Sequence, residues 1–239
     1  GHETMSPWLI AGGIGLGLLL LGGATAAAAG GPRVPARDLT RTQALDILRA
    51  AGVVKREALS AVGTISVSSK LGGVTYRYMG HNRGAEEMAP QTAVLLLRLG
   101  EWLHARYGVM IVDHKGVYPG KSPDAGNAHN RGMAVDFATF VGADGRSLDV
   151  TRDWGNKPPR ADRGYRLTPA DTGFEFFAAL YDFLSSEVTN GGSLGGHGYL
   201  LTPDHLDPAV FGDHQDHVHA QLGPTTTTPA VKATPTVKA

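Results

Sequence analysis

The sequence has no cysteine among its 239 residues. Disulfide bonds and thiolate ligands are therefore excluded, so any metal site must be built from imidazole and carboxylate groups. The chain also lacks a net charge, because 22 basic side chains balance 22 acidic ones. Such a balance gives no overall field that would attract a polyanion, and we expect no binding of nucleic acid.

Charge is locally absent as well, since residues 6–31 carry no charged side chain and are rich in leucine, glycine and alanine. This length of apolar chain predicts contact with a membrane through residues 7–30, as a transmembrane helix or as a signal peptide. A buried core helix is the alternative, which the many glycines disfavour. Arginines follow the segment and none precedes it, and the positive-inside rule would then leave the rest of the chain in the cytoplasm. We expect a cell-envelope protein, anchored or exported, with its orientation open.

The remaining chain is long enough for one well-buried domain with appendages. We divide it into the hydrophobic segment 1–31, a linker with a leading helix at 32–63, a main domain at 64–224 and a tail at 225–239. The tail consists largely of threonine, proline, alanine and lysine, and it is too poor in large apolar groups to fold.

Hydrophobic periodicity and turn residues predict the secondary structure of the main domain. Thr40 is suited to cap the leading helix, Gly72-Gly73 to turn a hairpin, and Gly108 to end a long amphipathic helix. We predict helices from Thr40, at 91–107 and at 174–188, and strands at 64–78, 109–112, 133–140 and 216–222. This succession indicates an α+β fold.

Histidines are unusually concentrated, with five of the ten between residues 197 and 219. In a strand, residues two apart point to the same face, so His217 and His219 are expected to project together. Asp136 is expected to share a face with the small residues Ala134 and Ala138, while its apolar neighbours form the other face. Gly132 would let the chain turn sharply and bring a histidine from the preceding loop over the same sheet face. The segments 127–136 and 213–219 can therefore converge on one ion.

Together the two segments resemble the superfamily of lysostaphin, D-Ala-D-Ala metallopeptidases and hedgehog, whose signature is His-x6-Asp followed much later by His-x-His. The inner context His129-Asn-Arg-Gly132-Met-Ala134-Val-Asp136 is similar to the D-Ala-D-Ala carboxypeptidase and endopeptidase branch. The resemblance covers residues 109–222. It implies a small antiparallel sheet with flanking helices and a zinc site on one sheet face.

Carried over by position, the resemblance makes His129, Asp136 and His219 the ligands of a Zn²⁺ ion and His217 the catalytic base. It implies a zinc peptidase that hydrolyses peptidoglycan stem peptides or cross-links, with D,D- or L,D-specificity. Two alternatives stay open: a non-catalytic binding module stabilised by zinc, and a cell-wall-processing segment of a larger secretion or delivery particle.

The residues around the motifs depart from the family in two places. Relatives carry serine or threonine where Asn127 stands, and an arginine near the position of Lys115. Lys115 and Lys121 could bind substrate as point charges, without the two-pronged grip of a guanidinium. The alternative is that both are solvated charges on loops. Asp213 and Asp216 are candidates to orient an imidazole, although a regular strand would turn Asp216 away from His217.

Overall fold

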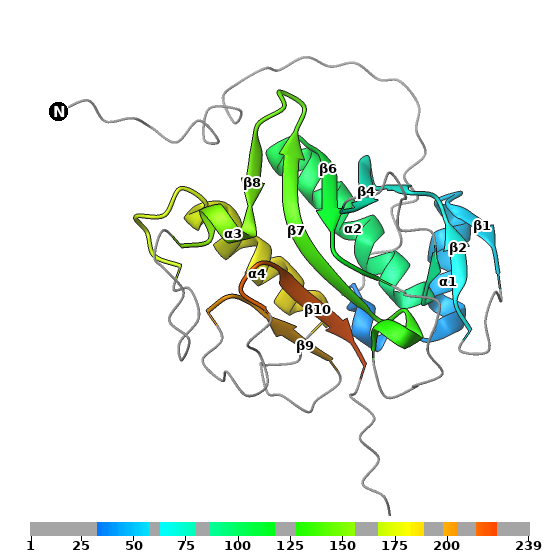
Figure 1. Ribbon diagram of the computed structural model, residues 1–239. Coiled ribbons are helices and arrows are strands. Elements are labelled where there is room, and N and C mark those ends of the chain that lie inside the picture. Colours follow the sequence, from blue (N-terminus) through cyan, green and yellow to red (C-terminus); the bar gives the residue numbers. More distant parts are fainter. Residues whose placement is uncertain are drawn as a thin grey trace, which may run out of the picture.

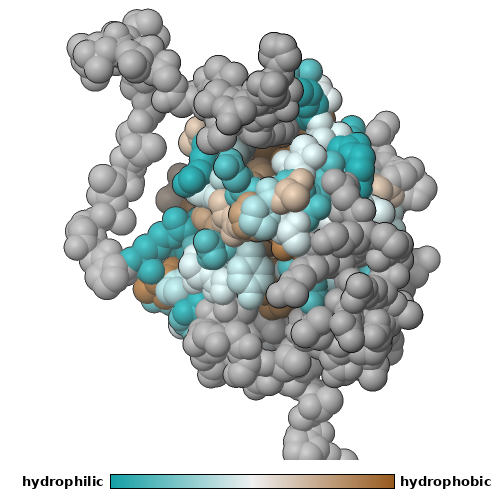
Figure 2. Space-filling view, turned by 90° about the vertical axis from the view of Figure 1, so that its left-hand side faces the viewer, coloured by the Kyte–Doolittle hydropathy of each residue, from teal (hydrophilic) through white to brown (hydrophobic). Residues whose placement is uncertain are grey.

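The computed structural model describes residues 33–57, 63–79, 87–117, 128–155, 167–188, 198–204 and 214–223. The predicted membrane segment 7–30, the tail 225–239, Lys121 and Asp213 lie outside these residues. Within the described part, no helix combines the length and the apolar character that a membrane crossing requires. On the face shown in Figure 2, hydrophilic and neutral residues surround smaller hydrophobic areas.

The described chain begins with a short 3-10 helix, η2 (Ala36–Asp38), and the helix α1 (Arg41–Ala50). Thr40 caps α1 as predicted, because its hydroxyl accepts from the Gln43 backbone while the Gln43 side chain accepts from the Thr40 backbone. Ahead of α1, the Ala36 amide donates to the buried carboxylate of Glu187, at 2.7 Å. The first described residues are thereby tied to a residue 151 positions later in the chain.

The strands form two sheets (Figure 1). The smaller has the order β1-β2-β5, with bounds Val54–Arg56, Ile65–Val67 and Glu87–Met88. The larger has the order β3-β4-β6-β7-β10-β9, with β8 also paired to β7. Its strands are β3 (Lys70–Leu71), β4 (Val74–Tyr78), β6 (Val109–His114), β7 (Ala134–Gly142), β8 (Ser147–Asp149), β9 (Gly198–Leu201) and β10 (Val218–Leu222).

The α+β class is confirmed, but two details of the prediction are wrong. β4 runs parallel to β6, so the larger sheet is mixed and not purely antiparallel. Two parallel neighbouring strands need a long crossover connection, which is usually helical. Here that connection contains the long helix α2 (Pro90–Tyr107). The predicted hairpin at 64–78 is confirmed only for β3 and β4, which turn at Gly72-Gly73, because β2 pairs in the smaller sheet.

Helices α2 and α4 (Phe174–Val188) pack against one face of the larger sheet, as Figure 1 shows. We call this the helix face. Both helices match the predicted ranges closely, and Gly108 ends α2 in the left-handed conformation, with φ 64°. A further short helix, α3 (Val150–Asp153), follows β8 and was not predicted.

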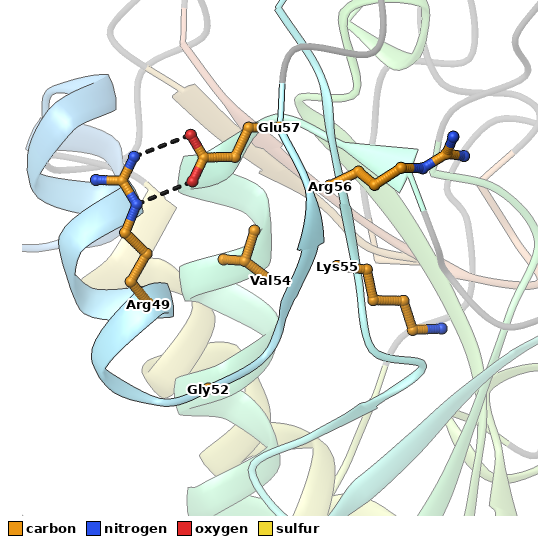
Figure 3. Close-up of a pocket in the computed structure, with 6 residues that line it drawn as sticks. All are labelled: Arg49, Gly52, Val54, Lys55, Arg56 and Glu57. Atoms are coloured by element: carbon orange, nitrogen blue, oxygen red, sulfur yellow. Dashed lines mark hydrogen bonds and ion pairs between the residues drawn. The ribbon is translucent and has the colours of Figure 1, made fainter.

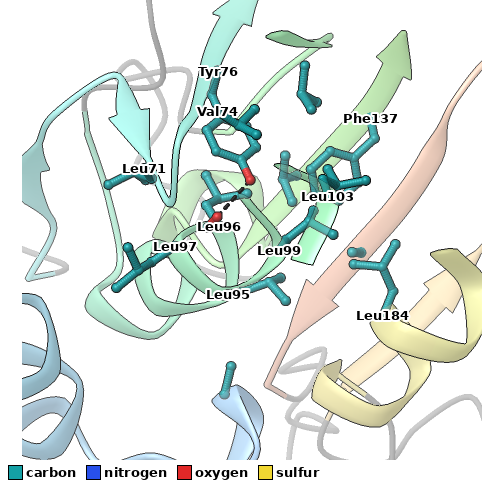
Figure 4. Packing of buried hydrophobic residues seen from close by; sticks show 14 of the residues in the cluster. Leu71, Val74, Tyr76, Leu95, Leu96, Leu97, Leu99, Leu103, Phe137 and Leu184 are labelled. Carbon is teal, nitrogen blue, oxygen red and sulfur yellow. Dashed lines mark hydrogen bonds between the residues drawn. The ribbon is translucent and has the colours of Figure 1, made fainter. Parts of the chain in front are cut away.

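Leucines of α2 fill the space beneath the helix face (Figure 4). Leu96 and Leu99 are fully buried, and each such side chain stabilises the fold by about 1.5–3 kcal/mol. Tyr76 on β4 is also fully buried, and its hydroxyl donates to the Leu96 carbonyl at 2.6 Å. On the same face of the sheet, beneath α4, Phe140 of β7 packs against Phe176 with ring centroids 5.0 Å apart.

β7 contains an irregularity that decides which side chains face the helices. Opposite it, β6 advances from His114 to Asp113 while β7 advances from Phe137 to Thr139, which leaves Ala138 in a β-bulge. Phe137 and Phe140 therefore both reach the helix face, although they are three residues apart. The strict alternation predicted around Asp136 ends at this bulge, and Ala138 is buried. We call the opposite side of the sheet, which carries Asp136, the site face.

Candidate metal centre

The candidate centre gathers side chains from a turn and from two neighbouring strands. His129 begins the 3-10 turn η3 (His129–Arg131), Asp136 lies on β7, and His219 lies directly opposite Asp136 on β10. The pairing of β7 with β10 thus brings together residues more than 80 positions apart in the chain.

Gly132 makes the turn that carries His129 possible. It ends η3 with φ 65°, a conformation that L side chains rarely adopt. A Cβ atom there would lie 2.8 Å from the backbone nitrogen of Ala89, so there is also no room for a side chain. The Gly132 carbonyl accepts from the Ala89 amide and from the Thr92 hydroxyl, at 3.0 and 2.7 Å. The turn is therefore fixed to the start of α2.

The Asp136 carboxylate stands between the two imidazoles. Its Oδ2 is 3.2 Å from His129 Nε2, and its Oδ1 is 2.7 Å from His219 Nδ1. The potential ligand atoms of His129, Asp136 and His219 all lie within 4.8 Å of one another, so this group could hold a metal ion. Two imidazole nitrogens and a carboxylate oxygen form the kind of donor set that leaves a fourth tetrahedral position open.

In both imidazoles, the ring nitrogen that faces away from Asp136 lies near an oxygen acceptor. This contact favours the tautomer whose other nitrogen is free to bind a metal ion. His129 Nδ1 is 3.3 Å from the Val117 carbonyl, an acceptor, so Nδ1 donates its proton there and Nε2 is directed to the centre. His219 Nε2 is 3.4 Å from the Gln221 Oε1 atom, which leaves Nδ1 directed to the centre. Gln221 is held in turn by the Gly223 carbonyl, at 3.3 Å. Such outer contacts orient metal-binding histidines and increase their basicity.

The electrostatics of the centre couple the carboxylate to the imidazoles. Burial would raise the pKa of Asp136, but the hydrogen bonds from His129 and His219 outweigh it and hold that pKa well below its usual range. Burial would likewise lower the pKa of His129, yet the hydrogen bond and charge of Asp136 raise it above the ordinary value. A cation that replaces the imidazole proton would meet the same carboxylate.

His217 stands beside these three residues, one position before β10 begins. Its Nε2 is 3.6 Å from Asp136 Oδ1, while its Nδ1 is 2.7 Å from Asp216 Oδ1. The expectation that Asp216 faces away from His217 is wrong, because Asp216 precedes the regular part of the strand. Asp216 also forms an ion pair with Lys115. Burial would raise the pKa of Asp216, but Lys115 and His217 outweigh burial and lower it.

Two further histidines, to which no role was assigned from the sequence, lie beside or near the centre. The ring of His214 lies 4.8 Å from that of His217 and 5.4 Å from that of His219, measured between centroids. His114 on β6 is 3% exposed, and within the described part of the chain neither of its ring nitrogens has a hydrogen-bond partner. Burial lowers the pKa of His114 to about 4. His214 lies outside regular structure, so no spacing rule points to it, and His114 is hidden among strand residues.

Among the residues predicted to bind substrate or to orient an imidazole, the structure describes Lys115 and Asp216. Lys115 lies at the centre, where its ammonium pairs with Asp216. Lys121 and Asp213 lie outside the described residues. Trp154, which follows α3, is 2% exposed, and its indole nitrogen donates to Asp204 at 2.9 Å. This contact ties the end of α3 to the residues after β9.

A surface pocket of about 360 Å³ lies elsewhere, between α1 and β1 (Figure 3). One side is closed by a two-pronged ion pair between Arg49 and Glu57, with both contacts at 2.9 Å. Lys55 and Arg56 extend away from that pair. None of the candidate site residues lines this pocket.

Comparison with known proteins adds no relative to this picture. No family model, no curated protein and no solved structure matches the chain. Function is therefore inferred from the residues and geometry of the centre and from its two sequence motifs.

Proposed function

We propose that the chain is a zinc-dependent peptidase of the cell envelope that hydrolyses peptidoglycan stem peptides or their cross-links. The carrying observation is the convergence of His129, Asp136 and His219 within 4.8 Å, with the His217 imidazole beside them. The proposal also draws on the likeness of the two motifs to the lysostaphin, D-Ala-D-Ala metallopeptidase and hedgehog superfamily, and it assigns the chain that fold.

The metal in this proposal is zinc, held by His129 Nε2, Asp136 and His219 Nδ1. Nitrogen ligands suit zinc better than magnesium or calcium, which prefer shells of oxygen. A bound zinc ion would acidify a water molecule and polarise the carbonyl of the scissile peptide bond.

His217 supplies the proton transfers that hydrolysis needs. Its Nδ1 hydrogen is directed to Asp216, so its Nε2 can accept a proton from the attacking water. The oxygen of this water forms a bond to the carbonyl carbon of the scissile peptide, and the carbon–nitrogen bond of that peptide breaks. His217 passes the proton to the leaving amine. Asp216 keeps the imidazole in the required orientation and stabilises the imidazolium between the two transfers.

The first test measures metal and activity in the full chain. We expect one zinc per chain by mass spectrometry, lost in His129→Ala and kept in His104→Ala, a matched change at an exposed histidine on α2. We expect the zinc-loaded protein to release peptides from purified peptidoglycan. His217→Ala should retain zinc but lose about 10²–10⁴-fold in rate, the usual contribution of a general base.

The outcomes separate the alternatives. Absence of zinc from the wild-type protein would refute the metal assignment. Zinc without release of peptides would refute the peptidase and favour the binding module. An unchanged rate in His217→Ala would remove the assigned base and leave the metal centre in place.

A further inference from the structure

We infer that Lys115 is a positioning residue that joins the metal-binding half of the centre to the half that carries the base. The inference deepens the proposed function and rests on it. It replaces the sequence-level expectation that Lys115 binds the substrate.

The backbone of Lys115 fixes the strand that carries Asp136. Beyond the last residue of β6, the Lys115 amide donates to the Asp136 carbonyl at 2.8 Å, and the Asp136 amide donates to the Gly116 carbonyl at 3.1 Å. A Cβ on Gly116 would lie 3.8 Å from Asp136 Oδ2 and 3.9 Å from His129 Nδ1. Residues 115 and 116 therefore form one wall of the centre, in direct contact with the candidate ligands.

The side chain of Lys115 extends to the other half of the centre. Its ammonium pairs with Asp216 Oδ2, while Asp216 Oδ1 accepts from His217 Nδ1 at 2.7 Å. The path from Lys115 through Asp216 to His217 crosses from the end of β6 to the residues before β10. With each carboxylate oxygen occupied, Asp216 has one orientation that satisfies both neighbours.

The small free energy expected from the Lys115–Asp216 ion pair favours a positioning role for Lys115 over a role in folding stability. The Lys115 and Asp216 side chains are 33% and 45% exposed, and ion pairs at that exposure contribute little to folding. Orientation of the His217 ring is different, because a base that presents the wrong nitrogen loses orders of magnitude in rate.

The test compares Lys115→Met, Lys115→Arg and Asp216→Asn with the wild type in the zinc-loaded full chain. We expect Lys115→Met to keep its zinc and to lose about 10- to 100-fold in kcat with little change in KM, in line with the cost of outer-shell changes. Lys115→Arg should recover most of that loss. The double variant Lys115→Met/Asp216→Asn should be no slower than the slower single variant, because both changes break one path. Lys55→Met, at an exposed lysine on β1, is the matched control and should behave as wild type.

A second measurement does not depend on turnover. In ¹⁵N-histidine-labelled protein, His217 should show a protonated Nδ1 and a bare Nε2, and Lys115→Met should shift it toward a mixture of tautomers. A raised KM with unchanged kcat in Lys115→Met would identify a substrate-binding lysine and overturn the inference. An unchanged His217 tautomer in Lys115→Met would overturn it as well. If the wild type releases no peptide, the proposed function fails and the tautomer alone decides the role of Lys115.

Discussion

The two faces of β7 differ in what holds them in place. On the helix face, Phe137 and Phe140 are fully buried and lie against each other, and Phe140 also contacts aromatic rings of α4. On the site face, Asp136 is held by two imidazoles at 2.7 and 3.2 Å. Apolar packing is non-directional, so no single pair of atoms determines it. Each polar contact at the centre, in contrast, joins one particular nitrogen to one particular oxygen.

We therefore expect stability and metal binding to be separable within this single strand. The helix face should account for most of the folding free energy, because burial scales with apolar area. The site face should determine what the protein binds, because its hydrogen bonds fix tautomers and directions. Three changes test whether the separation holds.

The largest expected effect is on the helix face. Phe140→Ala should lower the free energy of unfolding by about 3–5 kcal/mol, since it leaves a cavity beside Phe176 and Phe177. Urea denaturation measures the loss, and Val141→Ala, one residue further on the site face, is the control with a much smaller loss. The molecules that remain folded should still bind one zinc. If Phe140→Ala instead abolished zinc binding in folded protein, the two faces would not be separable.

The next effect arises at His114, a polar residue in the buried interior next to the centre. Its folded-state pKa of about 4 lies below its ordinary value of 6.5, so the folded state resists protonation. Stability should therefore fall as the pH drops from 6.5 towards 4, by up to about 3 kcal/mol, at 1.36 kcal/mol per pKa unit. His114→Leu should remove this part of the acid dependence.

The comparison of wild type and His114→Leu is best made by chemical denaturation of metal-stripped protein at several pH values. Equal slopes of stability against pH in the two proteins would show that His114 is solvated or paired.

The smallest effect is expected behind the centre. Gln221→Leu should weaken zinc binding by about 10- to 100-fold, because His219 Nε2 would lose its acceptor. Competition with a zinc chelator measures the change. Gln91→Leu, at a partly buried glutamine whose side chain donates to the Leu39 carbonyl, is the matched control and should leave the affinity unchanged. Equal affinity in Gln221→Leu and wild type would show that the Gln221 contact does not support the ligand.

The parts of the fold that the sequence predicted well are those with local causes. The cap at Thr40, the end of α2 at Gly108 and the range of α4 each follow from residues within a few positions. The pairing of β2 with β1 and β5, and the parallel neighbours β4 and β6, depend on partners distant in the chain. Periodicity carries no information about such partners.

The centre shows the same division. Residue spacing predicted that the segments 127–136 and 213–219 meet, and the family resemblance implied the ligands His129, Asp136 and His219. The structure brings these three residues together. The bulge at Ala138 was not predicted, because an extra residue in a strand has no sequence pattern of its own. The predicted strand 216–222 also begins later than expected, at Val218, so Asp216 lies outside it. Lys115 was noticed for its charge, but its partner is 101 residues away.

The Gly132 carbonyl, which receives the Ala89 amide and the Thr92 hydroxyl, has one further consequence. The turn that carries His129 also holds the start of α2 in place. The N-cap residue of that helix, Ala89, has only a methyl side chain, which cannot form a capping hydrogen bond. The turn and the helix therefore cannot diverge independently. Any insertion or deletion between Ala128 and Met133 would have to be matched by a compensating change at the start of α2.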